Sequence, residues 1–269
     1  MSHASSPIIL TTLLLEKNRW NGKGPSLNVE EWLEPMAETG FHGFELWMHH
    51  LALASRSDWE AIKNEAAAQQ VELSMIYAQL PADTGEKGRR QREALLDACD
   101  FFRPKALRFH LGEPITQDGY ISKLSSRLET AKVFIQDIPR DIALVFEPQL
   151  YPFQMDEAEK VLGTLGSDRV SLCLRVMEMP KKDLEAAFAL GKNAITHFSI
   201  RAKKGKDFVA LSQQRDLCKQ ILQQARQAGF IGPWLLETTQ GVGAKGEDAA
   251  DLFDAAERDF AFLQEFFGN

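Results

Sequence analysis

Short apolar runs alternate along the chain with longer segments in which apolar residues recur at helical spacing. Each apolar run has the length of a strand and is bounded by glycine, proline or polar residues, a pattern typical of strands buried on both faces. The runs cover residues 8–14, 43–48, 73–78, 106–111, 142–147, 170–177, 195–200 and 234–237. The helical segments cover residues 29–39, 58–70, 89–102, 121–137, 155–165, 181–192, 214–228 and 249–267. The pattern therefore predicts strand–helix pairs in succession.

Strand–helix pairs joined by short connections favour an α/β fold. The simplest topology is a parallel, closed (β/α)8 TIM barrel, which would form a single domain over residues 1–269. The alternative is an open doubly wound sheet, but no Gly-x-Gly-x-x-Gly follows the first run, so dinucleotide binding has no support. The glycine-rich residues 239–247 are expected to form a mobile loop after the last strand. The expected helix caps are Asn28 and Ser57 at helix starts and Gly40, Gly166, Asn193 and Gly229 at helix ends.

Composition narrows the class of protein. The chain has 269 residues, 44% of them hydrophobic, which is enough for one large core. A formal net charge of -7 argues against a nucleic-acid-binding protein. Cys99, Cys173 and Cys218 are far apart and form no Cys-x-x-Cys, which indicates reduced core thiols in a cytoplasmic protein. The apolar opening is short and has no Lys or Arg before it, so we expect a first strand rather than a signal peptide or membrane span.

The run 142–147 ends on a carboxylate, Glu147, and Pro148 follows at once. Burying a charge without a partner costs on the order of several kcal/mol. At the carboxyl end of a parallel strand, the usual reason for such an acid is an active site. Glu147 is therefore the first candidate catalytic residue.

Side chains alternate along a strand, which assigns each strand residue either to the barrel interior or to the surrounding helices. With Glu147 inward, Gln149 also points inward. The other residues that alternation places inside are Glu45, Trp47, Arg108, His110, Cys173, Arg175, Met177, His197, Ser199, Arg201, Glu237 and Thr239. Polar residues thus gather at the strand ends, as expected of a site at the carboxyl-terminal mouth of a barrel.

Each of these residues also has a structural interpretation. An interior Arg or Glu can be half of a structural ion pair, and His110 can be a hydrogen-bonded packing histidine. His49 and His50 can form a solvated loop pair. Trp47 and Tyr77 can fill the barrel rather than provide a surface on which a sugar stacks. The convergence of several acids and cations on one space is what favours a functional site.

Six segments carry a resemblance to a known family. They are Gly40-Phe-His-Gly-Phe-Glu-Leu46, Leu107-Arg-Phe-His-Leu-Gly112, Leu144-Val-Phe-Glu147, Ser171-Leu-Cys-Leu-Arg175, Thr196-His-Phe-Ser-Ile-Arg201 and Leu235-Leu-Glu237. In their order and spacing the chain, from about Pro7 to its end, resembles the xylose isomerase-like TIM barrels. That family includes sugar-phosphate isomerases and epimerases, inosose dehydratases and endonuclease IV-type repair enzymes. Its frequent oligomers imply a homodimer.

The resemblance also implies a metal site, and the sequence departs from it. Ketose epimerases of the family hold one divalent metal (Mn, Mg, Zn or Co) with Glu, Asp, His and Glu, and the two glutamates form the acid–base pair. At the corresponding positions of this sequence, the two glutamates are Glu147 and Glu237, but the aspartate is replaced by Arg175 and the histidine by Ser199. His197 is expected deeper in the barrel, below the ligand layer. An arginine stays protonated and repels a metal. We therefore expect no metal, and expect Arg175 within hydrogen-bonding reach of at least one of the two glutamates.

The leading hypothesis is a sugar or sugar-phosphate isomerase or epimerase that transfers a proton between carboxylates without the metal of the family. Glu147 and Glu237 would be base and acid, and Arg175, with His110 as a neutral donor, would hold the enediolate charge. The expected substrate-binding residues are Glu45, Trp47, Tyr77, Arg108, Gln149, Ser199, Arg201 and Lys203. Arg201 and Lys203, with Lys204, would bind an anionic group, although residues 201–206 can also be a solvated loop.

Two other functions stay open. The barrel can be a non-catalytic subunit that binds a small molecule or a partner, with the Glu–Arg–Glu cluster as a structural plug. Nucleic-acid repair is disfavoured by the six histidines of the chain, too few for a cluster of zinc ligands, and by its net charge of -7. The expected partner is a sugar-like or anionic small molecule, with no nucleic acid and no membrane.

Overall fold

Parallel strands form a closed barrel in this protein. The computed structural model describes residues 6–19, 24–81, 85–112, 117–149, 154–166, 168–190 and 193–267. Among these residues, the barrel strands follow one another in the order β1-β10-β7-β6-β5-β4-β3-β2. The strands are β1 (Ile8–Thr11), β2 (Gly43–Trp47), β3 (Leu73–Gln79), β4 (Ala106–His110), β5 (Ala143–Phe146), β6 (Val170–Arg175), β7 (Ile195–Ile200) and β10 (Trp234–Leu236). The predicted (β/α)8 barrel is confirmed.

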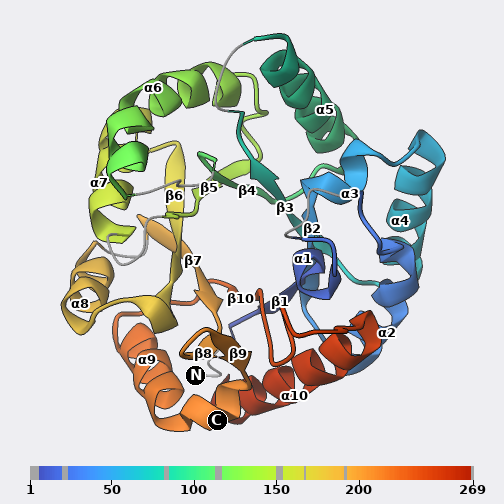
Figure 1. Ribbon diagram of the computed structural model, residues 1–269, viewed down its shortest axis with the longest axis vertical. Helices are drawn as coiled ribbons and strands as arrows, with labels where there is room; N and C mark the ends of the chain where they lie inside the picture. Colours follow the sequence, from blue (N-terminus) through green and yellow to red (C-terminus); the bar gives the residue numbers. More distant parts are fainter. Residues whose placement is uncertain are drawn as a thin grey trace. The chain divides into compact units, whose positions relative to one another are not determined.

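Helices connect the strands and can be followed in Figure 1. The α-helices are α1 (Thr12–Leu15), α2 (Leu33–Thr39), α3 (Met48–Ala52), α4 (Arg56–Ala68), α5 (Glu86–Phe102), α6 (Gln117–Ile135), α7 (Gln154–Leu165), α8 (Lys181–Ala189), α9 (Arg215–Gln227) and α10 (Ala249–Phe267). Short 3-10 turns are η1 (Val29–Trp32), η2 (Val176–Glu178) and η3 (Leu211–Gln214). No helix in the described part of the chain combines the length and apolarity needed to cross a membrane.

The chain comprises two compact units. One unit consists of residues 1–74, 175–177 and 197–269, and the other of residues 75–174 and 178–196. The first unit carries β1, β2, β10 and most of β7, and the second carries β4, β5 and most of β3 and β6. A single domain over the whole chain stays a prediction.

In the second unit, the register of β4 and β5 fixes which residues share a face. Phe109 lies opposite Phe146, and their rings are 5.6 Å apart between centroids. Because side chains alternate, Arg108 and Glu147 take the other face of the same two strands. In Figure 1, α5 and α6 lie on the outer side of these strands. Arg108 and Glu147 therefore share a face of this sheet, as side-chain alternation predicts.

Several predicted boundaries are wrong for local reasons. The run 8–14 is not one strand: β1 ends at Thr11, and α1 begins at Thr12, whose hydroxyl accepts a hydrogen bond from the Trp47 amide at 3.0 Å. The N-cap of α4 is Ser55 rather than Ser57, because Ser55 and Asp58 form a reciprocal capping box. Helix α8 ends at Ala189, so Asn193 does not cap it. The expected left-handed ends at Gly40, Gly166 and Gly229 are found.

The loop of residues 239–247, expected to be mobile, is anchored at its end. Arg19 donates from Nη1 to both carboxylate oxygens of Glu247, at 2.8 and 2.9 Å. The same guanidinium donates from Nε and Nη2 to the carbonyl oxygens of Leu13 and Leu14, at 2.9 and 2.6 Å. Arg19 therefore joins the segment after β1 to the loop after β10.

Thr239 does not point into the barrel as alternation predicted. Its hydroxyl donates to Asp259 Oδ2 on α10 at 2.7 Å, and the Leu211 amide donates to Asp259 Oδ1 at 2.8 Å. Asp259 is 1% exposed, and burial raises its pKa to about 6, against the lowering effect of these hydrogen bonds. The carboxylate is thus a buried charge that ties α10 to two loops.

We predict that Asp259→Asn stabilises the protein above pH 6. A raised folded-state pKa means that the folded protein holds the proton more tightly than the unfolded chain, so stability is present at low pH and lost as pH rises through about 6. Asn removes the charge and keeps both contacts, because the Thr239 hydroxyl can turn to accept. The gain should reach up to about 3 kcal/mol at pH 8 and vanish near pH 4, measured by urea unfolding.

The matched control is Asp254→Asn, an exposed carboxylate on the same helix. It should change the free energy of unfolding by less than about 0.5 kcal/mol at either pH. A loss of stability in Asp259→Asn at pH 8 would show that the charged form is needed there.

All three cysteines are free and buried, as predicted. Burial raises the pKa of Cys99 and Cys218 to about 12, with smaller contributions from nearby Asp100 and Asp259 respectively. Thiols of this kind are unreactive at neutral pH. Neither Cys99 nor Cys218 is therefore a candidate nucleophile.

Candidate functional site

Glu147 forms a fully buried ion pair with Arg108. Arg108 Nη1 donates to Glu147 Oε2 at 2.8 Å, and both side chains are 0% exposed. The guanidinium carbon of Arg108 lies 3.8 Å from the centroid of the Tyr77 ring. Arg108 thus compensates the charge of Glu147 and stacks on an aromatic face. From the sequence, Arg175 was expected within reach of Glu147 or Glu237, and the structure pairs Glu147 with Arg108.

A contact of the His110 ring indicates which of its two nitrogens carries the proton. Nδ1 lies 3.3 Å from the Gly112 carbonyl oxygen, and the ring centroid is 5.5 Å from that of Tyr77. A carbonyl oxygen can only accept, so Nδ1 carries the proton in this contact. A neutral His110 then offers Nε2 as an acceptor. The expected role of His110 as a neutral donor would require the other tautomer.

Tyr77 is a poor platform for a sugar in this arrangement. Its ring is covered by Arg108 and lies near His110, and the residue is 6% exposed. Gln149, also expected to bind substrate, is half-buried beyond the end of β5. These positions favour a supporting role for Tyr77.

Glu157 on α7 is a residue that sequence reasoning missed. Its Oε2 accepts a hydrogen bond from the Gln149 amide at 2.9 Å, and the residue is 1% exposed. This contact holds the segment Glu147-Pro148-Gln149 against α7 and so positions the catalytic candidate. The available signal was helical spacing, because Glu157 lies one turn before the buried Val161.

In the other unit, Glu237 lies directly after β10 and is surrounded by donors and cations. Ser199 Oγ on β7 donates to Glu237 Oε2 at 2.9 Å. Arg175 Nε, at the end of β6, lies 3.7 Å from the same oxygen, and Arg201 Nη1 lies 3.6 Å from it. The Glu237 side chain is 3% exposed, while those of Arg175 and Arg201 are 13% and 11% exposed. Arg175 therefore lies at ion-pair distance from one of the two expected glutamates.

The residues around Glu237 do not fit a divalent metal at that carboxylate. Two guanidinium groups approach its Oε2 at less than 4 Å. Both would repel a cation placed there, and neither can lose its proton near neutral pH. Among the described residues, no group of three or more His, Cys, Asp or Glu side chains has the geometry of a metal site.

A β-hairpin, absent from the sequence prediction, follows β7 at once. It pairs β8 (Ala202–Lys204) with β9 (Asp207–Val209) in antiparallel register. Arg201 and Lys203 both approach the Phe208 ring, at 5.6 and 4.9 Å from its centroid. The basic run 201–206 is therefore an ordered element rather than an irregular loop.

Trp47 lies at the end of β2 beside two histidines. Its ring centroid is 4.8 Å from that of His49 and 5.4 Å from that of His50. His50 is 4% exposed and lies in α3, so the two histidines are not a solvated loop pair. Burial lowers the pKa of His50 to about 4, although Glu16, 3.8 Å away, opposes this shift.

The structure thus gathers the candidate residues into two clusters, one in each unit. The first cluster contains Glu147, Arg108, Tyr77, His110 and Gln149. The second cluster lies in the other unit and contains Glu237, Arg175, Ser199, Arg201 and Lys203. Glu45 and Trp47 belong to the same unit as Glu237, and Glu45 is fully buried on β2.

The fold was compared with known proteins. The sequence matches no family model and no curated protein. Among solved structures, D-psicose 3-epimerase from Clostridium cellulolyticum H10, solved with D-tagatose, has a TM-score of 0.70 at 11% identity, over 97% of this chain and 99% of that one. A sugar phosphate isomerase/epimerase from Parabacteroides distasonis ATCC 8503 has a TM-score of 0.65 at 13% identity, over 99% and 96%. A xylose isomerase-like TIM barrel protein from Mycobacterium smegmatis, solved with magnesium, has a TM-score of 0.64 at 15% identity, over 97% and 98%.

Proposed function

We propose that this chain, whose fold is that of the xylose isomerase-like TIM barrels, is a sugar or sugar-phosphate isomerase or epimerase. The observation that carries the proposal is the Glu237 cluster: a buried carboxylate at a strand's carboxyl end, bonded by Ser199 and flanked by two arginines. Carboxylates so placed serve as acid–base groups in barrel enzymes. The structural likeness to D-psicose 3-epimerase supports proton transfer on carbon as the reaction class.

In the proposed mechanism, Glu237 acts as an acid–base group on a carbon beside a carbonyl, and Glu147 is the second acid–base candidate. The arginines Arg175 and Arg201 provide positive charge beside Glu237, where an enediolate oxygen would develop negative charge. Guanidinium groups thus take the electrostatic role that a divalent ion has in metal-dependent isomerases.

The experiment that tests this function is proton exchange with solvent. Ketoses, aldoses and their phosphates would be incubated with the protein in D2O, and deuterium at the carbon beside the carbonyl followed by NMR. The proposal expects exchange with at least one member of the panel. A panel without exchange, at protein concentrations that detect slow turnover, would argue against it.

Metal binding gives a separate prediction. The wild-type protein should show no Mn2+ binding in a calorimetric titration, because Arg175 and Arg201 flank Glu237. The double variant Arg175→Asp/Ser199→His replaces one cation and the hydroxyl by metal ligands, and should bind Mn2+ at least about tenfold more tightly. Lys206→Asp has the charge change of Arg175→Asp on an exposed turn and should not bind Mn2+. Equal affinity in the wild type and the double variant would contradict the metal-free site.

A second candidate function is a non-catalytic barrel that binds a small molecule or a partner subunit. The observation that favours it is the 0% exposure of both Arg108 and Glu147, which is typical of a structural plug. A thermal-shift screen with sugars, sugar phosphates, polyols and divalent ions separates the two. A ligand at a hundredfold excess over its Kd stabilises by about 2.7 kcal/mol, which raises Tm by several degrees. No shift with any of these compounds would favour the plug.

A further inference from the structure

The hairpin β8–β9 presents two chemically different faces. A turn at Gly205 and Lys206 joins its strands, and Gly205 has a left-handed φ of 66°. The register places Lys203 opposite Phe208 and Lys204 opposite Asp207. Residues directly opposite in an antiparallel pair point to the same side, and neighbours along a strand point to opposite sides. One face therefore carries Lys203 with Phe208, and the other carries Lys204 with Asp207.

Two cations are held on the Phe208 face. Lys203 Nζ is 4.9 Å from the centroid of the Phe208 ring, and the Arg201 guanidinium carbon is 5.6 Å from it. Cation–π contacts of this length are attractive and restrict where the cations can lie. Gln214 Nε2 also donates to the Lys203 carbonyl, which holds β8 in place. The two like charges are thus fixed on one side of a small ordered sheet.

This face is the one next to Glu237. Arg201 Nη1 is 3.6 Å from Glu237 Oε2, and Ala202, which starts β8, is 1% exposed and continues directly from Arg201. Lys203 is half-buried, whereas Lys204 is exposed. Arg201 therefore lies beside the carboxylate that the proposed mechanism uses, Lys203 shares the Phe208 ring with Arg201, and Lys204 lies on the opposite face of the hairpin.

We infer that the Phe208 face of the hairpin is an anion subsite, in which Lys203 and Arg201 bind a carboxylate or phosphate group of the substrate. The inference rests on the proposed function for the identity of the ligand as a substrate. Arg offers a planar fork of donors to such a group, and Lys a point charge, a combination suited to either anion. Phe208 is a positioning residue that aims both cations. The subsite names the substrate class: a sugar that carries a carboxylate or phosphate group.

The test compares anionic and neutral ligands on matched variants. D-fructose 6-phosphate, D-glucuronate and D-fructose would be titrated calorimetrically into the wild type, Lys203→Met and Lys204→Met. The two variants lose the same charge from adjacent residues on opposite faces. We expect at least one anion to bind the wild type, with about tenfold weaker binding in Lys203→Met, the loss of one charge-assisted contact, and less than about twofold change in Lys204→Met.

Phe208→Leu provides the positioning control. It should weaken binding of the anion several-fold while leaving the circular dichroism spectrum unchanged. An equal loss of anion affinity in Lys203→Met and Lys204→Met would mean that the anion responds only to the overall surface charge, and it would overturn the inference. Absence of anion binding in the wild type would also overturn it. Anion binding without deuterium exchange on any sugar would instead leave the subsite standing and remove the proposed isomerase activity.

Discussion

Glu237→Gln and Glu147→Gln are each expected to lower the rate of deuterium exchange by roughly 10²–10⁴-fold, which is the usual contribution of a general acid or base. Gln is close to Glu in shape, and at position 237 its amide oxygen can still accept from Ser199 Oγ, so the loss would report on proton transfer. The measurement is the initial rate of deuterium incorporation by NMR, with the substrate that the wild type turns over.

The control for these variants is Glu185→Gln, a side chain 61% exposed on α8. It should exchange at the wild-type rate, and all variants should have wild-type circular dichroism spectra. Exchange at the wild-type rate in Glu237→Gln would exclude Glu237 as an acid–base group. Loss in Glu237→Gln alone would leave Glu147 with the structural role that its complete burial also allows.

Arg108→Met is expected to cost about 3–5 kcal/mol of folding free energy, because it leaves the Glu147 carboxylate buried without its guanidinium. The double variant Arg108→Met/Glu147→Leu removes both charges and should recover most of this loss. A double-mutant cycle measured by urea unfolding gives the coupling energy between the two side chains.

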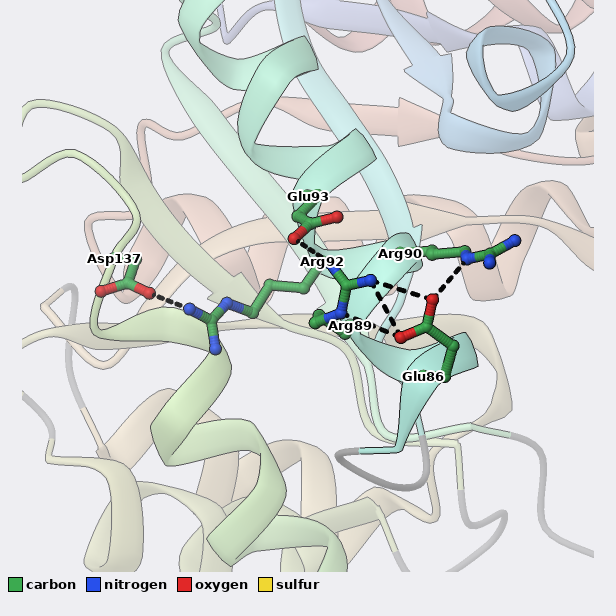
Figure 2. A network of polar contacts seen from close by, with 6 residues as sticks. All are labelled: Glu86, Arg89, Arg90, Arg92, Glu93 and Asp137. Carbon is green, nitrogen blue, oxygen red and sulfur yellow. Dashed lines mark hydrogen bonds and ion pairs between the residues drawn. The ribbon is translucent and has the colours of Figure 1, made fainter.

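The control is an arginine in an exposed ion-pair network. Figure 2 shows Arg89 on α5 between Glu86 and Glu93. In the same network, Arg90 forms an ion pair with Glu86, and Arg92 forms one with Asp137. Arg89 is 53% exposed, and surface pairs of this kind contribute about 0–1 kcal/mol. Arg89→Met should therefore change stability far less than Arg108→Met. A similar small effect in both would mean that Glu147 is compensated by groups other than Arg108.

The strand pattern of the sequence was sufficient to predict the barrel and which residues share a face with each of the two glutamates, but not that Arg108 is the ion-pair partner of Glu147. Strict alternation predicts that Arg108 shares a face with Glu147, and the register of β4 and β5 bears this out. The same rule predicts that Ser199, Arg201 and Glu237 meet across β7 and β10, whose strands are paired in register. These contacts follow from local backbone geometry alone.

Features that depend on tertiary contacts were not predicted. The hairpin β8–β9 has short strands rich in lysine, which carry no apolar pattern, and its order depends on Phe208 and Gln214. Thr239 departs from alternation because Asp259 on α10 provides a hydrogen-bond partner outside the barrel. The tautomer of His110 is set by the Gly112 carbonyl oxygen, which no residue pattern specifies.

We propose that proton transfer in this protein depends on carboxylates flanked by arginines and requires no divalent ion. Deuterium exchange by the wild type should be measured in excess EDTA and then with added Mn2+. We expect the same exchange rate in EDTA, in Mn2+ and in neither. Exchange that disappears in EDTA and returns with Mn2+ would contradict it.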